Sequence, residues 1–167
     1  MSFREIKPEE LNENVFKLIG KDWMLITAGS KDNCNTMTAS WGAMGIMWGK
    51  PSVTCYIRQS RYTKEFVDRE EYFTISVFDE EYRKALNLCG TVSGRDRDKI
   101  KEAGLTVCEA GSSVAFEEAK IIIVCKKEYA QFMGPENFTE KANDERWYED
   151  KDYHTMYIGS IEKILIK

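Results

Sequence analysis

Apolar and polar positions alternate along several short stretches of this chain, with the period of a β-strand. In 52–58, Val53, Cys55 and Ile57 alternate with more polar neighbours, as expected of a half-buried strand. Other stretches rich in β-branched and aromatic residues also predict strands. These predicted strands are 23–30, 72–78, 119–132 and 154–167.

Helical patterns are fewer and shorter. The first twenty residues predict an extended arm and a helical turn that enters through Pro8 and ends at Gly20. Further short helices are predicted at 63–69, 79–90 and 96–103. Because strands outnumber helices, the pattern predicts a mainly β fold, a β-barrel with short helices at its periphery. At 167 residues, without repeats or linkers, residues 1–167 are expected to form a single domain.

Charge and composition narrow the function. A net charge of −4 provides no basic field for a nucleic acid, so no nucleic acid partner is expected. The longest apolar runs are too short to cross a bilayer, and the polar N-terminus lacks a signal-peptide core. Five cysteines without a CxxC pair fit free thiols in a reducing compartment. We therefore expect a cytoplasmic protein with no membrane partner.

Residues 35–49, NTMTASWGAMGIMWG, are small, hydroxylated and rich in glycine, with two tryptophans. A loop of this composition lets backbone N–H groups approach a flat ligand closely. The ordinary alternative is a strand edge with tight turns. Trp41 is expected beside the ligand, because an aromatic ring near exposed amides suits a planar heterocycle. Trp48 is assigned to the core.

The segment RQSRYT, 58–63, has the composition of a phosphate-binding site. Arg58 and Arg61 can each present a planar fork, and Ser60 and Thr63 can add hydroxyl donors. Ser60 is also predicted to cap the helix 63–69. The alternative is a solvated helix start. With a ring site at 35–49, these residues suggest a nucleotide-like cofactor.

Many catalytic motifs are missing from the sequence, including GxGxxG, GxxxxGK[ST], HExxH and GxSxG. His154 is the only histidine, so a site with several histidine ligands is impossible, and no metal is expected. His154 either takes part in a hydrogen bond at the start of a strand or lies beside a bound ligand. The polar run SGRDRDK, 93–99, could equally be an exposed helix start.

Three segments in this order, NTMTASWG, RQSRYT and CGTVSGRDRDK, resemble the flavin reductase-like family, and more closely its flavoredoxin-type branch. The likeness runs from the first predicted strand to the C-terminal HTMYIGSIEKI. It implies an FMN-binding split barrel that forms a homodimer, with FMN in a cleft near the subunit interface.

The resemblance also implies roles for particular residues. The ring and ribityl chain of FMN would contact residues of the first segment, the phosphate would contact RQSRYT, and the third segment would close the pocket. No side chain is required as acid, base or nucleophile. The implied cofactor-binding residues are Asn35, Thr38, Ala39, Ser40, Trp41, Arg58, Ser60, Arg61, Thr63, Cys89, Gly90, Ser93, Gly94 and His154.

Two functions remain open on this basis. One is an NAD(P)H-dependent flavin reductase, which takes a hydride from NADH or NADPH onto flavin N5 and passes electrons to a small molecule or a redox protein. The other is a non-catalytic FMN electron-transfer protein of the flavoredoxin kind. The sequence leaves open the nicotinamide, the acceptor, whether FMN exchanges, and the role of 134–147.

Overall fold

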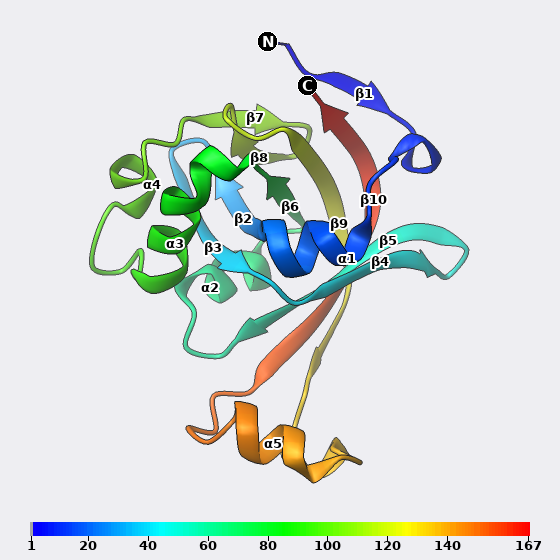
Figure 1. Cartoon of the computed structure of the whole chain (residues 1–167), viewed down its shortest axis with the longest axis vertical. Helices are drawn as coiled ribbons and strands as arrows, with labels where there is room; N and C mark the ends of the chain where they lie inside the picture. The colour runs from blue at the N-terminus through cyan, green and yellow to red at the C-terminus, as the bar shows by residue number, and fades with distance from the viewer. Residues whose placement is uncertain (1) are drawn as a thin grey trace.

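The computed structural model describes residues 2–167. Its main element is an antiparallel sheet of eight strands, with a separate two-stranded sheet, β7 and β8, beside it (Figure 1). The strands are β1 (Arg4–Ile6), β2 (Met24–Ser30), β3 (Asn33–Ala39), β4 (Gly42–Met47), β5 (Lys50–Arg58), β6 (Tyr72–Val77), β7 (Val107–Ala110), β8 (Ser113–Phe116), β9 (Ile121–Phe132) and β10 (His154–Ile166).

The order of strands explains the curled shape of the sheet. The path runs β3-β2-β6-β9-β10-β5-β4, and β1 pairs with β10 outside this path. The two ends of the path, β3 and β4, are joined in sequence by Ser40 and Trp41 alone. The sheet must therefore curl until its ends meet at this corner. The result is an open barrel in which β3 and β4 are not hydrogen-bonded to each other within the described chain.

All helices are short and lie outside the sheet (Figure 1). The mainly β fold with peripheral helices is thereby confirmed. Within residues 2–167, no helix is both long enough and apolar enough to span a membrane. The helices are the 3-10 turns η1 (Pro8–Glu10), η3 (Glu80–Tyr82) and η4 (Pro135–Asn137), the π-helical turn η2 (Leu18–Asp22), and α1 (Val15–Lys17), α2 (Tyr62–Arg69), α3 (Arg83–Thr91), α4 (Lys99–Glu102) and α5 (Lys141–Trp147).

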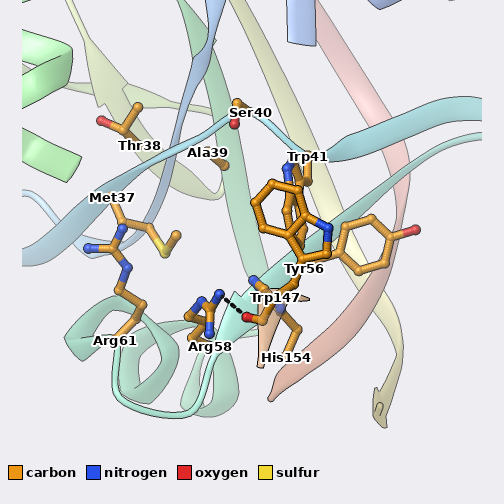
Figure 2. Close-up of a pocket in the computed structure, with 10 residues that line it drawn as sticks. All are labelled: Met37, Thr38, Ala39, Ser40, Trp41, Tyr56, Arg58, Arg61, Trp147 and His154. Atoms are coloured by element: carbon orange, nitrogen blue, oxygen red, sulfur yellow. Dashed lines mark hydrogen bonds between the residues drawn. The ribbon is translucent and has the colours of Figure 1, made fainter. Parts of the chain in front are cut away.

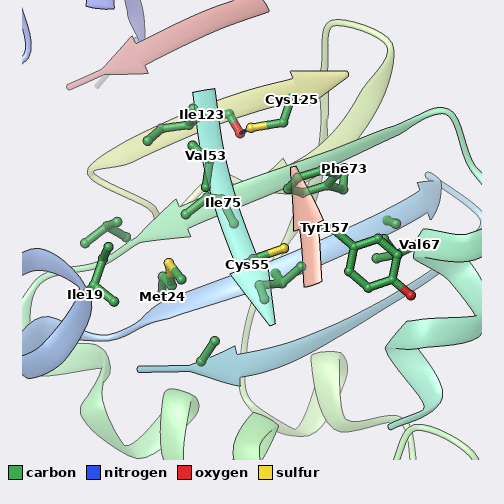
Figure 3. Close-up of a cluster of buried hydrophobic side chains, with 14 of the residues drawn as sticks. Ile19, Met24, Val53, Cys55, Val67, Phe73, Ile75, Ile123, Cys125 and Tyr157 are labelled. Carbon is green, nitrogen blue, oxygen red and sulfur yellow. Dashed lines mark hydrogen bonds between the residues drawn. The ribbon is translucent and has the colours of Figure 1, made fainter. Parts of the chain in front are cut away.

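The core lies inside the curled sheet and is closed by α2 (Figure 3). Val53, Cys55 and Ile57 are fully buried, which confirms the alternation of 52–58. Tyr157 spans the core, and its hydroxyl donates to Asp68 on α2 at 2.5 Å. This bond fastens the helix that follows the arginine segment to the middle of the sheet.

Some sequence predictions of local structure were wrong. Residues 35–39 form most of β3 rather than a ligand loop, because they pair with β2 in continuous register from Ser30↔Asn33 to Met24↔Ala39. Trp48 is 52% exposed and not in the core. Trp48 and Gly49 both have positive φ angles, 51° and 71°, and form the two-residue turn between β4 and β5.

The helix boundaries also differ from expectation. Arg61, not Ser60, is the N-cap residue of α2. Gly90 lies inside α3, which continues to Thr91, and the predicted helix 96–103 is reduced to the four residues of α4, capped by Asp98. Strands β4, β7 and β8 were not anticipated. They are only four to six residues long, and all four residues of β8 are buried, so β8 shows no alternation.

Candidate functional site

A cavity of about 270 Å³ opens at the corner where the two ends of the sheet meet (Figure 2). Its walls come from β3, the corner itself, the end of β5, the start of β10, and α5. The residues that line it are Met37, Thr38, Ala39, Ser40, Trp41, Tyr56, Arg58, Arg61, Trp147 and His154. Of the sequence-predicted site residues, the structure therefore gathers Thr38, Ala39, Ser40, Trp41, Arg58, Arg61 and His154 in one place.

Strand pairing brings the β5 and β10 residues together. His154 is directly opposite Arg58 in the β5–β10 ladder. Tyr56 is two residues before Arg58 and therefore lies on the same face of β5. Since Cys55 and Ile57 fill the core on the other face, Tyr56 and Arg58 are free to face the cavity.

Two arginines give the cavity a positive character. Burial and the nearby Arg58 both lower the pKa of Arg61. Keeping Arg61 charged inside the cavity therefore costs free energy. Arg61 Nη1 donates to the backbone carbonyl of Gly90 at 2.8 Å. Among residues 2–167, no carboxylate side chain lines this cavity. An anion placed between the guanidinium groups would relieve their repulsion.

Arg58 also binds the segment that joins β9 to β10. Its Nη2 donates to the carbonyl of Trp147 at 2.9 Å, and its Nη1 donates to the carbonyl of Asp152 at 2.8 Å. Both acceptors lie in residues 134–153, the excursion that joins β9 to β10 and contains α5. Arg58 therefore holds the excursion against the cavity, and Figure 2 shows its bond to Trp147.

Aromatic rings form the opposite side of the cavity (Figure 2). Trp41 meets Trp147 edge to face, with ring centroids 5.1 Å apart, and lies 5.2 Å from the His154 ring. The Tyr148 hydroxyl and His154 Nδ1 are hydrogen-bonded at 2.6 Å. Burial, and then the charge of Arg58, lower the pKa of His154 to about 4. His154 is therefore neutral at pH 7 and adds no charge to the cavity.

Other predicted site residues are engaged elsewhere. Ser60 is hydrogen-bonded to the Asp152 carboxylate. Asn35 Nδ2 donates to Thr63 Oγ1 at 2.7 Å, and both side chains are buried. Asn35 lines a separate cavity of about 380 Å³, together with Gly94.

Residues of the third sequence segment, CGTVSGRDRDK, contact the elements around the cavity rather than line it. Lys99 is 3% exposed, and its Nζ donates to the carbonyls of Cys89 and Val92 at 3.0 Å each. With Arg61 on the Gly90 carbonyl, two cations satisfy the C-terminal end of α3. Burial raises the pKa of Cys89 to about 11, which keeps it a thiol. Ser93 Oγ accepts from the Arg95 backbone N–H.

Sequence reasoning missed Met37, Tyr56 and Trp147 as lining residues. A signal existed for Tyr56, because the strand alternation placed it on the face of Arg58. Met37 belongs to β3, and its position in the cavity follows from the corner geometry. Trp147 reaches the site only through the fold of the excursion, for which the sequence carries no local signal.

An open antiparallel barrel whose cavity combines two arginines with an aromatic wall is suited to a ligand that is both flat and anionic. The fold and cavity thus define the class as an open antiparallel barrel with a cationic, aromatic-walled cavity at its corner. The model of the flavin reductase like domain matches residues 17–167. The chain belongs to the flavin reductase-like family.

Several solved structures share the fold of this chain. An FMN-binding domain of a flavin reductases-like enzyme from Shewanella baltica OS155 is 17% identical, with a TM-score of 0.70 over 99% of this chain and 77% of that one. Flavoredoxin of Desulfovibrio vulgaris (Miyazaki F) is 20% identical, with a TM-score of 0.68 over 97% and 77%. Nitrilotriacetate monooxygenase component B from Bacillus cereus is 21% identical, with a TM-score of 0.66 over 98% and 81%. No curated protein sequence matches the chain.

Proposed function

We propose that the chain binds FMN in the cavity at the corner of the barrel and acts as an NAD(P)H-dependent flavin reductase. The observation that carries the proposal is the pair Arg58 and Arg61 in a cavity whose described lining holds no carboxylate. The flavoredoxin-type likeness of the sequence and an FMN-binding structural neighbour support flavin as the ligand.

The residues present fit such a ligand. The guanidinium groups suit a phosphate. β3 is at an end of the sheet path, so alternate backbone groups of Met37–Ala39 are not used by the ladder and can meet the edge of a ring. Backbone groups carry this role, because the Thr38 hydroxyl donates to the Leu86 carbonyl.

The size of the cavity is consistent with part of the ligand. Small-molecule sites usually enclose about 300 to 1,000 Å³, slightly more than the 270 Å³ measured here. An apolar groove of about 700 Å³ adjoins the cavity across Ser40, Trp41 and Tyr56. A ring that extends past Trp41 would enter this groove, whose far side is formed by Val15, Phe16 and Ile19.

When bound, FMN supplies the hydride chemistry, with NADH or NADPH as donor and N5 as acceptor. The chain's own residues bind, orient and shield. The arginines hold the anionic end, and the β3 amides would stabilise negative charge at the pyrimidine edge. Trp41 and Trp147 exclude water from the ring. Neutral His154 leaves the charge of the site to the arginines.

A second candidate is a non-catalytic FMN electron-transfer protein of the flavoredoxin kind. The likeness to flavoredoxin supports it, and it uses the same cavity. In either case the electrons pass to a small molecule or to a redox protein.

We further propose a homodimer. Phe16, which lines the apolar groove that adjoins the cavity, is 89% exposed, and Ile46, two residues beyond the groove-lining Met44, is 72% exposed. Exposed apolar side chains of this size beside a groove are typical of a surface that a partner covers. The five free cysteines support a reducing, cytoplasmic location.

The deciding experiment begins with the purified protein and added FMN. We expect a yellow complex, with FMN bound more tightly than riboflavin because only FMN carries the phosphate. Stopped-flow mixing with NADH and with NADPH then separates the candidates. Bleaching supports the reductase, whereas an unchanged spectrum supports the electron-transfer protein. A protein that stays colourless with FMN would refute both.

A further inference from the structure

The carboxylate of Asp152 occupies donors of the arginine segment. Asp152 Oδ1 accepts from the Ser60 backbone N–H at 3.0 Å, and Oδ2 accepts from the Ser60 hydroxyl. The backbone carbonyl of Asp152 also accepts from Arg58 Nη1 at 2.8 Å. One residue of the excursion therefore engages a backbone amide, a hydroxyl and a guanidinium group.

These three donors are the kinds that bind a phosphate group. A carboxylate resembles one edge of a phosphate, since both present two oxygens and negative charge to the same donors. The two cannot use the Ser60 N–H and hydroxyl at once. Asp152 thus occupies donors beside Arg58 that a phosphate held by this arginine would otherwise reach.

We propose that Asp152 is an internal competitor for the phosphate group at Ser60 and Arg58, and so sets how strongly the protein prefers phosphorylated over unphosphorylated flavin. The proposal rests on the proposed function. A phosphate that binds here displaces the Asp152 side chain. The free energy of the Asp152 contacts is lost in this exchange, so the affinity for the phosphate is lower.

The same competition also affects Trp147 on the aromatic side of the cavity. Arg58 holds the carbonyls of both Asp152 and Trp147, and the Trp147 ring packs against Trp41. When a phosphate draws Arg58 away from these carbonyls, the excursion loses contacts at the point where it meets β5. Binding of the anion and the position of Trp147 are therefore coupled through one guanidinium group.

The central test is Asp152→Asn, assayed by titration with FMN and with riboflavin. The variant removes the competing charge and keeps a side chain of the same shape. We expect FMN to bind roughly two to five times more tightly, the range for one exposed charged contact, with riboflavin unchanged. The matched control is Glu149→Gln. Glu149 is an exposed carboxylate of the same excursion, and among the hydrogen bonds and ion pairs of residues 2–167 it engages neither Ser60 nor Arg58, so its variant reports the general field.

A second variant isolates the contact. In a Ser60→Ala background the Asp152→Asn change should favour FMN less, because the contested hydroxyl is missing and only the Ser60 backbone N–H remains. The proposal is overturned if Asp152→Asn leaves the ratio of FMN to riboflavin affinity unchanged, or if Glu149→Gln changes it equally. Tighter binding of NADH but not FMN would assign the phosphate to the nicotinamide and also overturn it.

The outcomes separate this inference from the proposed function. If the wild-type protein and Asp152→Asn both fail to bind FMN, the proposed function fails, and this inference with it. If the wild-type protein prefers FMN over riboflavin and Asp152→Asn does not increase that preference, the inference alone is wrong.

Discussion

The amide of Asn35 donates to the hydroxyl of Thr63 at 2.7 Å, and this bond joins β3 to α2 inside the protein. Both residues were predicted from the sequence to bind the cofactor. The structure buries them against each other, with Asn35 4% and Thr63 1% exposed. They connect the strand that forms one wall of the cavity with the helix that follows the arginines.

Thr63→Val should therefore lower stability. It removes the acceptor and leaves the Asn35 amide buried, at a cost of about 1 to 3 kcal/mol. Gly94→Ala should act on the same bond, because a Cβ at Gly94 would lie 2.1 Å from Asn35 Oδ1 and would displace the amide. Urea unfolding measures both effects.

The double variant tests whether one bond is responsible. Because Gly94→Ala and Thr63→Val break the same contact, the double variant should lose less stability than the sum of the two single losses. As a control, Gly20→Ala should cost little, since a Cβ there meets nothing within 4 Å. Fully additive losses for the two variants would contradict the shared mechanism.

Arg61→Ala should weaken FMN binding and leave riboflavin binding nearly unchanged. Arg61 is half-buried in the cavity and has no carboxylate partner among the ion pairs of residues 2–167, so its charge is available to a phosphate. We expect a loss of roughly tenfold to a hundredfold, the range for a hydrogen bond between charged groups of about 1.5 to 3 kcal/mol. Fluorescence titration with the two flavins measures it.

The control for this prediction is Arg97→Ala, which removes an arginine that pairs with Glu102 away from the cavity. It should change neither affinity. Equal losses of FMN and riboflavin affinity in Arg61→Ala would remove phosphate contact as the role of Arg61.

Strands β2, β5, β6, β9 and β10 could be predicted because each carries its own local pattern of apolar and β-branched residues, whereas β3, β4, β7 and β8 were missed. The pattern of 52–58 alone fixed which face of β5 is buried and placed Arg58 on the other. The pairing of β5 with β10 then set His154 opposite Arg58, a long-range relationship that no local pattern contains. The same holds for Asn35 and Thr63, whose bond depends on how α2 packs against β3.

Trp48 and Trp147 show where composition misleads. Both are large and apolar, which favours burial, yet Trp48 lies at a hairpin turn and is 52% exposed. Trp147 lines the cavity because Arg58 binds its carbonyl and its ring packs edge to face against Trp41. The hairpin turn decides the position of Trp48, and contacts with other elements decide that of Trp147, rather than either residue's own chemistry.

Acid should destabilise the protein through His154. Its pKa is about 4 in the folded chain against an ordinary value of 6.5, so the unfolded state binds more protons between these values. Stability therefore rises with pH across this window, and acidification from pH 6.5 to 4 should remove up to about 3 kcal/mol. Unfolding by urea at several pH values measures the slope.

His154→Gln separates this effect from the titration of carboxylates. Glutamine takes up no proton, so the stability of the variant should depend less on pH between 4 and 6.5, with the same carboxylate contribution below. If the two proteins lose stability in parallel over this range, His154 is not the responsible group.

The homodimer proposal predicts that a charge on the exposed apolar surface will separate the subunits. Ile46 lies on β4 two residues beyond Met44, which lines the apolar groove, and so shares its face. Ile46→Asp would place a carboxylate against apolar surface in the partner. We expect the wild-type protein to sediment at twice the 19.3 kDa mass of the chain and the variant to sediment as a monomer. The conservative Ile46→Val should stay dimeric. A monomeric wild-type protein would refute the homodimer. A dimer that tolerates Ile46→Asp would place the interface elsewhere, and Phe16→Asp then tests the groove itself.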